Sequence, residues 1–173
     1  MMRLGRIVVS GVAVGGRGGR GGGVGGVAAV DAGFLRAFGG SGAGNGQFSR
    51  PFCVALDHEG NVVVSDFNNH RIQVLRYRDG QHLRTIGQRG AGNGQFNDPR
   101  GVALDGGGHL VVVELGNHRV QVLNYADGSH VRTIGSKGSG QGQFSGPMGG
   151  ICIDGDGRII VCDTDNHRIQ VLQ

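Results

Sequence analysis

A stretch of seven residues that occurs three times constrains the fold of this chain more than any other feature. It reads Asn-His-Arg-Ile-Gln-Val-Leu at residues 69–75 and 166–172, and Asn-His-Arg-Val-Gln-Val-Leu at residues 117–123. The copies are 48 and 49 residues apart. A repeat period of about 40–50 residues is typical of propeller blades and solenoid units. The sequence therefore predicts an array of similar units.

A glycine-rich motif precedes each copy of the heptapeptide. The pattern Gly-x-Gly-x-Gly-Gln-Phe-x-x-Pro lies at residues 42–51, 90–99 and 138–147. Its glycines permit turns with positive φ, and its single Phe is expected to anchor the loop on the strands. The proline then fixes the entry to the next strand, where a missing N–H group does least harm.

Four short strands are expected in each unit. In the first full unit they lie at residues 52–56, 61–65, 71–76 and 82–86, joined by tight turns. The second is continuously apolar, which predicts burial on both faces between neighbouring sheets. The fourth carries Arg84 within an apolar run, as a half-exposed outer strand would. The 38 glycines among 173 residues favour strands and turns over helices.

The two motifs keep their mutual spacing through three copies, and together they resemble the NHL repeat. That family forms β-propellers whose blades are four-stranded antiparallel sheets, most often six of them. The resemblance covers residues 34–173 and implies an all-β chain of about three blades. The implied parts are an outer strand at 34–38, blades at 48–86 and 96–134, and a blade at 144–173 that lacks its last strand.

Residues 1–33 match this pattern only in fragments. Residues 5–11 resemble the second strand of a blade, so we interpret the segment as an eroded, partly disordered blade remnant. Residues 15–26 are rich in Gly and Arg and contain two Arg-Gly-Gly triplets. Disordered segments of this kind contact RNA, and a flexible insert without a binding role is the alternative.

The repeats are too few for a closed ring. Propellers close with about 4–8 blades, whereas this chain supplies three near-complete blades and a remnant. We therefore expect an incomplete or open propeller. Three alternatives stay open: a fragment of a longer protein, an open arc, or half of a ring made by two copies. An open arc exposes sheet edges and an apolar face, which favours self-association, and residues 34–38 would complete the unfinished last blade.

The net charge of +4 is concentrated outside the repeats. Residues 34–173 hold 13 Lys or Arg and 12 Asp or Glu, a net charge of only +1. The basic composition of the whole chain therefore overstates the charge of the repeats. No apolar run approaches the roughly 18–20 residues of a membrane span, and we expect a cytoplasmic protein. The three cysteines lie in apolar strand patterns and are expected to be buried thiols.

The candidate binding residues lie in loops that precede the third strand of each unit. In a propeller these loops share one rim with the glycine-rich loops, so that neighbouring blades place them in an arc. The candidates are Asn69, His70, Arg71, Asn117, His118, Arg119, Asn166, His167, Arg168, Arg89 and Lys137.

A structural role competes with binding at these positions. Asp66, Glu114 and Asp163 end the preceding strands, four residues before each His. An acidic residue, an Asn and an Arg repeated in every unit are also expected to form a hydrogen-bonded set that fixes the loop. Zinc binding by the three His residues is disfavoured, because equivalent positions in adjacent blades are too far apart to share one ion. We therefore predict no metal site.

No nucleophile elbow, phosphate loop or distinct carboxylate pair is present, so neither a catalytic residue nor a cofactor is predicted. The leading hypothesis is a non-enzymatic scaffold that binds protein partners through the rim loops, as the resemblance implies. The alternative is single-stranded RNA binding on the same rim, as in NHL proteins of the tripartite-motif class. Its contacts would include Arg50, Arg89, Arg100 and Lys137. A propeller lyase or hydrolase is the third alternative.

Overall fold

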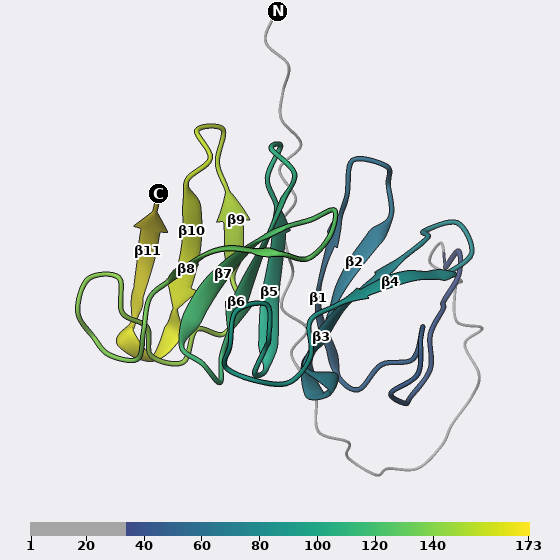
Figure 1. The fold of residues 1–173 in the computed structure, drawn as a ribbon, viewed down its shortest axis with the longest axis horizontal. Coiled ribbons are helices and arrows are strands. Elements are labelled where there is room, and N and C mark those ends of the chain that lie inside the picture. The colour runs from purple at the N-terminus through teal and green to yellow at the C-terminus, as the bar shows by residue number, and fades with distance from the viewer. Residues whose placement is uncertain (1–33) are drawn as a thin grey trace, which may run out of the picture.

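Short strands dominate the structure, a computed structural model that describes residues 34–173. Eleven strands and two 3-10 turns follow one another in this range, which contains no α-helix. The strands form three antiparallel sheets that stand side by side, and each sheet is one blade (Figure 1). The expected blade remnant and the Arg-Gly-Gly triplets lie outside the described residues.

Each blade is a meander in which every strand pairs with the next one along the chain. Blade 1 consists of β1 (Pro51–Leu56), β2 (Val62–Asp66), β3 (Arg71–Leu75) and β4 (His82–Ile86). Blade 2 consists of β5 (Pro99–Leu104), β6 (His109–Glu114), β7 (Arg119–Asn124) and β8 (His130–Ile134). Blade 3 consists of β9 (Ile151–Ile153), β10 (Ile159–Asp163) and β11 (Arg168–Leu172). The 3-10 turns are η1 (Phe67–Asn69) and η2 (Thr164–Asn166).

This architecture confirms the predicted fold class, an all-β chain of antiparallel propeller blades. The sheets do not close into a ring within the described residues. The strand bounds of blade 1 agree with the predicted ones to within one residue. Blade 3 departs from the pattern. Its first strand, β9, has only three residues, and the extra residue of the 49-residue interval lies just before it, near Gly149.

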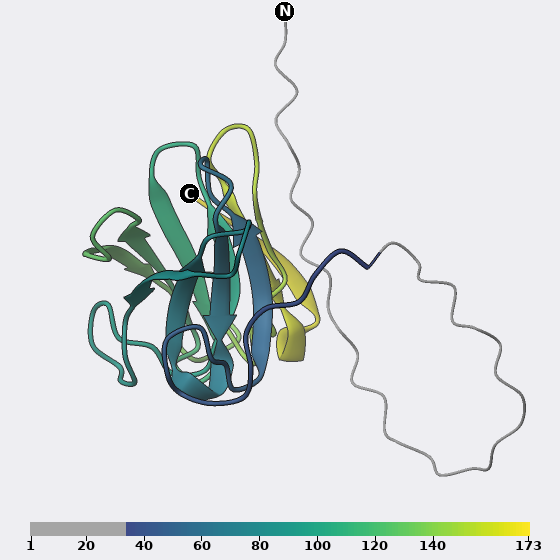
Figure 2. The ribbon, with the colours of Figure 1, turned by 90° about the vertical axis from the view of Figure 1, so that its right-hand side faces the viewer.

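The segment at residues 34–38, here called the arm, is not a strand in the structure, although an outer strand was predicted there. An outer strand forms by pairing with the third strand of its own blade, and for the arm that strand would fall before residue 34. The arm instead lies against blade 1 (Figure 2). Arg36 donates a hydrogen bond to the carbonyl of Arg78, and the Phe38 ring lies on Gly80.

The hydrophobic core is divided between the blade interfaces. Every residue of β2 is buried, as its unbroken apolar pattern predicts. Burial of such faces between neighbouring sheets is the main source of stability for this fold. The interface between blades 1 and 2 contains Cys53, Ala55, Val63, Ile72, Val74 and Ile86 on one side and Phe96, Val102, Leu110, Val112, Leu123 and Tyr125 on the other.

The phenylalanines of the glycine-rich loops anchor these loops in the core, as predicted. Phe96 and Phe144 are fully buried, and Phe48 is partly buried. Gly87 has a φ of +77° and lies against the Phe96 ring, where a Cβ atom would come within 2.2 Å of a ring carbon. Only glycine combines this backbone conformation with such close contact.

The cysteines differ in exposure. Cys53 is buried, as predicted, whereas Cys162 is half-buried and Cys152 is exposed. The expectation of three buried thiols is therefore wrong for blade 3. Both of its cysteines lie on the face that no further blade covers within the described residues. Between residues 34 and 173, no helix is long and apolar enough to cross a membrane.

Candidate functional site: the Asn-His-Arg rim

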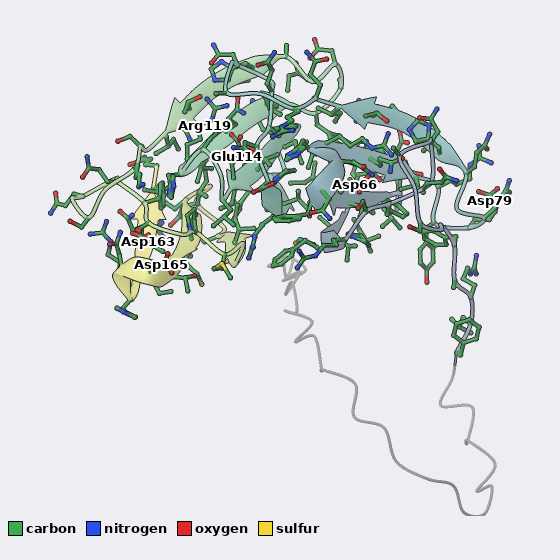
Figure 3. The ribbon with its side chains drawn as sticks, turned by 90° about the horizontal axis from the view of Figure 1, so that it is seen from below. Asp66, Asp79, Glu114, Arg119, Asp163 and Asp165 are labelled. Carbon is green, nitrogen blue, oxygen red and sulfur yellow. The ribbon has the colours of Figure 1, made fainter. Side chains whose placement is uncertain are left out.

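The three Asn-His-Arg loops and the glycine-rich loops lie at the same end of the blades, which we call the Asn-His-Arg rim. It is the lower edge of the molecule in Figure 1. Figure 3 shows this rim from below, with the strand-ending carboxylates Asp66, Glu114 and Asp163 following one another in an arc. The structure thus gives the predicted shared rim.

A buried carboxylate organises each loop. Asp66 has no exposed surface and lies 2.8 Å from Nε of Arg71. The Asp66 carboxylate also accepts hydrogen bonds from the side-chain amides of Asn69 and Gln73, at 2.9 and 3.1 Å, and from the backbone N–H of Ser49 at 2.8 Å. A buried charge is tolerated when it is paired and hydrogen-bonded in this way.

The same side chains hold the glycine-rich loop in place. Asn69 donates to the carbonyl of Gly42 at 2.9 Å. Arg71 donates to the carbonyls of Gly44 and Gln47, at 2.7 and 3.0 Å. The Asn and Arg side chains of the motif therefore join the two loops of a blade, which supports the structural role considered from sequence.

Blades 2 and 3 repeat this arrangement. Glu114 accepts hydrogen bonds from Arg119 and Asn117, both at 2.6 Å. Asp163 accepts them from Arg168 at 2.8 Å and Asn166 at 2.9 Å. Burial favours the neutral carboxylic acid of Asp163, yet its hydrogen bonds and the nearby arginine prevail and lower its pKa.

The histidines of the motif, unlike the neighbouring Asn and Arg, do not bind the buried carboxylate. His70, His118 and His167 all adopt left-handed backbone conformations, with φ between 50° and 53°, where each ends a tight turn. His70 accepts a hydrogen bond through Nδ1 from the backbone N–H of Asp98 at 3.1 Å. This contact joins blade 1 to blade 2. Within the described residues no group of three metal-ligating side chains lies close enough to hold an ion.

Arg89 and Lys137 occupy equivalent places on the rim. Each forms an isolated backbone bridge with the buried Phe of its loop, Phe96 or Phe144. Both side chains are exposed, and neither makes a hydrogen bond or ion pair within residues 34–173. Of the predicted site residues, these two thus keep their charged groups available to a ligand.

A cluster at the inner edge of the same rim, where the first strands of neighbouring blades meet, combines the RNA-contact candidates Arg50 and Arg100 with three apolar residues that the sequence did not single out. Arg100 of β5 stacks on the rings of Phe52 and Phe67, with centroid distances of 4.8 and 4.9 Å. It also lies 2.9 Å from the sulfur of Met148. The guanidinium of Arg50 also lies over the Phe67 ring, 5.3 Å from its centroid. We call these five residues the inner cluster.

The inner cluster is electrostatically unusual. Burial and the neighbouring charge of Arg50 lower the pKa of Arg100, against the opposing effect of Asp98. Nε of Arg100 is buried and has no hydrogen-bond partner among the described residues. Phe52, Arg100 and Met148 occupy one place in successive repeats, 48 residues apart. A Phe, an Arg and a Met at one repeat position differ chemically, whereas most repeat positions are similar. This difference is the sequence signal that could have identified the cluster.

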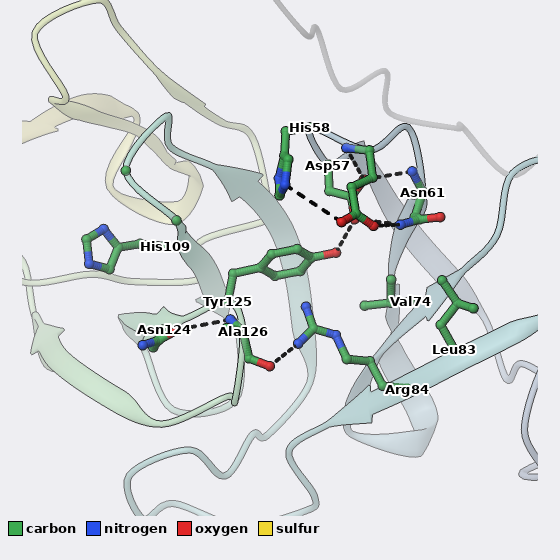
Figure 4. A pocket seen from close by; sticks show the side chains of 13 residues that line it. Asp57, His58, Asn61, Val74, Leu83, Arg84, His109, Asn124, Tyr125 and Ala126 are labelled. Carbon is green, nitrogen blue, oxygen red and sulfur yellow. Dashed lines mark hydrogen bonds and ion pairs between the residues drawn. The ribbon is translucent and has the colours of Figure 1, made fainter.

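A pocket of about 470 Å³ lies between blades 1 and 2 at the opposite rim (Figure 4). The Tyr125 hydroxyl donates to the carboxylate of Asp57 at 2.8 Å, and the Arg84 guanidinium lies 4.2 Å from the centre of the tyrosine ring. His58 and Glu59 are exposed at its mouth. This polar set ties the two blades together and was not predicted.

We expect Tyr125 to ionise at about pH 12. Burial and the Asp57 carboxylate raise its pKa to that value, although Arg84 acts in the opposite direction. The stabilising effect of the neutral phenol is complete below the unfolded pKa of about 10 and is lost as the pH rises through the folded value. The absorbance of the phenolate in a Tyr77→Phe variant, whose sole tyrosine is Tyr125, measures this directly. A midpoint near pH 10 in the folded protein would contradict the contact with Asp57.

The fold and the rim define three consecutive blades of a β-propeller. The sequence pattern of the NHL repeat matches residues 48–75, 96–123 and 149–172, one match in each blade. The chain is therefore an NHL-repeat protein, as the two motifs indicated.

Relatives by sequence match over short stretches. The chain is 54% identical over 37 residues to the B-box type zinc finger protein ncl-1 of Caenorhabditis elegans. It is 46% identical over 40 residues to the E3 ubiquitin-protein ligase TRIM71 of Rattus norvegicus. These matches cover 21% and 23% of this chain, and 4% and 5% of the two relatives.

Solved structures share the fold at low sequence identity. A virginiamycin B lyase from Staphylococcus aureus superimposes with a TM-score of 0.54 at 14% identity, over 72% of this chain and 38% of the lyase. Glutaminyl cyclase from Myxococcus xanthus gives 0.52 at 17% identity, over 75% of this chain and 59% of the cyclase. Identities this low show a common fold and carry no catalytic activity across to this chain.

Proposed function

We propose that this chain is a non-enzymatic interaction module that binds a protein partner on the Asn-His-Arg rim. The inner cluster is the observation that carries this proposal. Aromatic residues, Met and Arg are enriched in the cores of protein interfaces, and the inner cluster consists of these residue types alone. Met148 is 40% exposed and gives the cluster an apolar contact surface.

The rest of the rim suits a rigid platform. Arg71 and Arg119 are committed to buried carboxylates and loop carbonyls, with side chains only 13% and 12% exposed. Positions that repeat identically in every blade support the loops, whereas positions that differ between blades distinguish one ligand from another. A rim fixed by hydrogen bonds loses little conformational entropy on binding, which favours affinity.

The chemistry of the inner cluster indicates the kind of partner. Arg50 and Arg100 present positive charge beside apolar rings, and Arg89 and Lys137 add exposed charge farther out. A peptide segment with an acidic side chain next to an apolar one complements this surface. Exposed aromatic platforms for stacked bases are not among the described rim residues, which favours protein over single-stranded RNA.

Selection of peptides from a random displayed library tests this function. We expect the whole chain to enrich sequences with Asp or Glu beside an apolar residue. A synthetic copy of an enriched peptide should bind at least tenfold more weakly to Arg100→Ala, because the variant lacks the cationic centre of the cluster. Arg78→Ala removes an exposed arginine from the opposite rim and serves as the matched control, with unchanged affinity.

Two outcomes would contradict the proposal. One is an enriched peptide whose affinity does not change in Arg100→Ala. The other is the absence of peptide enrichment together with binding of a single-stranded RNA oligonucleotide that is lost in the double variant Arg89→Glu and Lys137→Glu. The second outcome would assign the rim to RNA.

A further inference from the structure

Blade 3 exposes apolar side chains that the other blades bury. Ile169 and Val171 of β11 are each 60% exposed. At the same places in blade 1, Ile72 and Val74 are 0% and 2% exposed, because they pack on blade 2. We call the side of a blade that turns toward the next blade its forward face. The forward face of blade 3 thus carries the apolar residues of a face that packs on another blade, but no blade packs on it within the described residues.

Blade 1 exposes the complementary side. On its backward face, which turns toward a preceding blade, Val54 and Leu56 are 54% and 49% exposed. Val102, at the place of Val54 in blade 2, is only 2% exposed. The arm and the first glycine-rich loop cover the rest of this face with Phe38 and Phe48.

Faces of these two kinds already meet twice within the chain. The interface of blades 1 and 2 joins a forward face to a backward face, and so does the interface of blades 2 and 3. Both interfaces use the same positions of the repeat. The forward face of blade 3 and the backward face of blade 1 therefore have the residues to form a third interface of the same kind.

The arm lies where the outer strand of a preceding blade would lie. In β4 and β8, Arg84 and Arg132 donate hydrogen bonds to carbonyls of the following blade, those of Ala126 and Gln173. Arg36 of the arm makes the equivalent contact with blade 1. The arm thus has the contacts of an outer strand on the side that faces blade 1.

We propose that two copies of this chain close one ring of six blades. In this ring, the forward face of blade 3 in each copy binds the backward face of blade 1 in the other. Six blades lie within the range of about 4–8 over which propellers close. A head-to-tail interface that closes after two copies gives a finite assembly.

The ring also completes blade 3. Among the described residues β11 pairs only with β10, so its outer edge is open. In blade 1, β3 pairs with β4 with Ile72 opposite Ile86. The same register places Phe38 of the second copy opposite Ile169. The arm then becomes the fourth strand of blade 3, and the exposed edge disappears, as edge protection requires.

The mass of the whole chain in solution tests this proposal. We expect light scattering to give twice the chain mass of 17.9 kDa. Ile169→Glu should give the mass of one copy, because it places a charge in the new interface. Its circular dichroism should remain that of a folded β protein, since Ile169 is 60% exposed in a single copy. Val131→Glu, which changes a 49% exposed residue of the outer strand β8, should keep the doubled mass.

Thiol labelling gives a second readout. Cys152 belongs to the forward face of blade 3 and is exposed in one copy. It should react slowly in the wild type and at least tenfold faster in Ile169→Glu. A wild-type mass of one copy, or of more than two, would overturn the ring, and so would a doubled mass that Ile169→Glu leaves intact. Peptide binding at the inner cluster is measured separately and does not depend on this outcome.

Discussion

Replacing Glu114 by Ala is expected to lower the free energy of unfolding by about 3–5 kcal/mol, the usual cost of removing one partner from a buried ion pair. Glu114 has no exposed surface, and its carboxylate accepts hydrogen bonds from Arg119, Gln121 and Asn117 and from the backbone N–H of Asn97. Its loss leaves these donors unpaired and leaves the Arg119 charge mostly buried. Urea unfolding at fixed protein concentration, followed by circular dichroism, measures the change.

Two further variants make this result specific. Glu114→Gln keeps one carbonyl acceptor and the shape of the side chain, so the loss should be smaller than in Glu114→Ala. Glu59→Ala removes an exposed carboxylate on the opposite rim and should change the free energy of unfolding by less than about 0.5 kcal/mol. Equal effects of Glu114→Ala and Glu59→Ala would refute the structural role of the rim carboxylates.

Replacing Phe96 by Ala should also cost about 3–5 kcal/mol of unfolding free energy, as is common for large-to-small changes in a packed core. Phe96 is fully buried between blades 1 and 2, and its ring packs on Gly87. The truncation opens a cavity that the rigid glycine turn cannot fill. The expected loss therefore combines lost hydrophobic transfer with the cavity.

Phe48 offers an internal comparison for this prediction. It occupies the place of Phe96 in the preceding loop but is only partly buried, because no complete blade precedes it within the described residues. Phe48→Ala should therefore cost clearly less than Phe96→Ala in the same denaturant series. A larger effect at Phe48 would mean that the first glycine-rich loop is covered more fully than the structure shows.

Most of the fold could be predicted because the repeats carry redundant signals. Apolar strand patterns, glycine turns and a proline before each first strand recur at a constant spacing, so each blade confirms the next. The prediction failed where pairing depends on residues beyond the pattern. The arm has the sequence of an outer strand, yet within residues 34–173 no third strand of its own blade comes before it. In blade 3, β9 is only three residues long and follows the extra residue near Gly149, and the repeat pattern does not predict this length.

The candidate site was predictable only in part. The acidic residue, Asn and Arg of each repeat were recognised as a supporting set, because their chemistry matches a buried ion pair. Arg50 and Arg100 were named as RNA-contact candidates, but their association with Phe52, Phe67 and Met148 was not predicted. These residues are far apart in sequence and meet only where the first strands of adjacent blades lie together. Tyr125 and Asp57 were missed for the same reason, since 68 residues separate them. Such contacts join residues of adjacent blades, and the pattern within one repeat does not show them.

In each blade the repeated rim residues support the fold, and the inner cluster is the proposed binding surface for the partner. The most direct test is the affinity of one selected peptide for Arg100→Ala and Glu114→Gln in parallel, each with its urea unfolding curve. We expect at least tenfold weaker binding by Arg100→Ala, and wild-type affinity with reduced stability for Glu114→Gln. Wild-type affinity in Arg100→Ala, with lost affinity in a folded Glu114→Gln protein, would contradict this expectation.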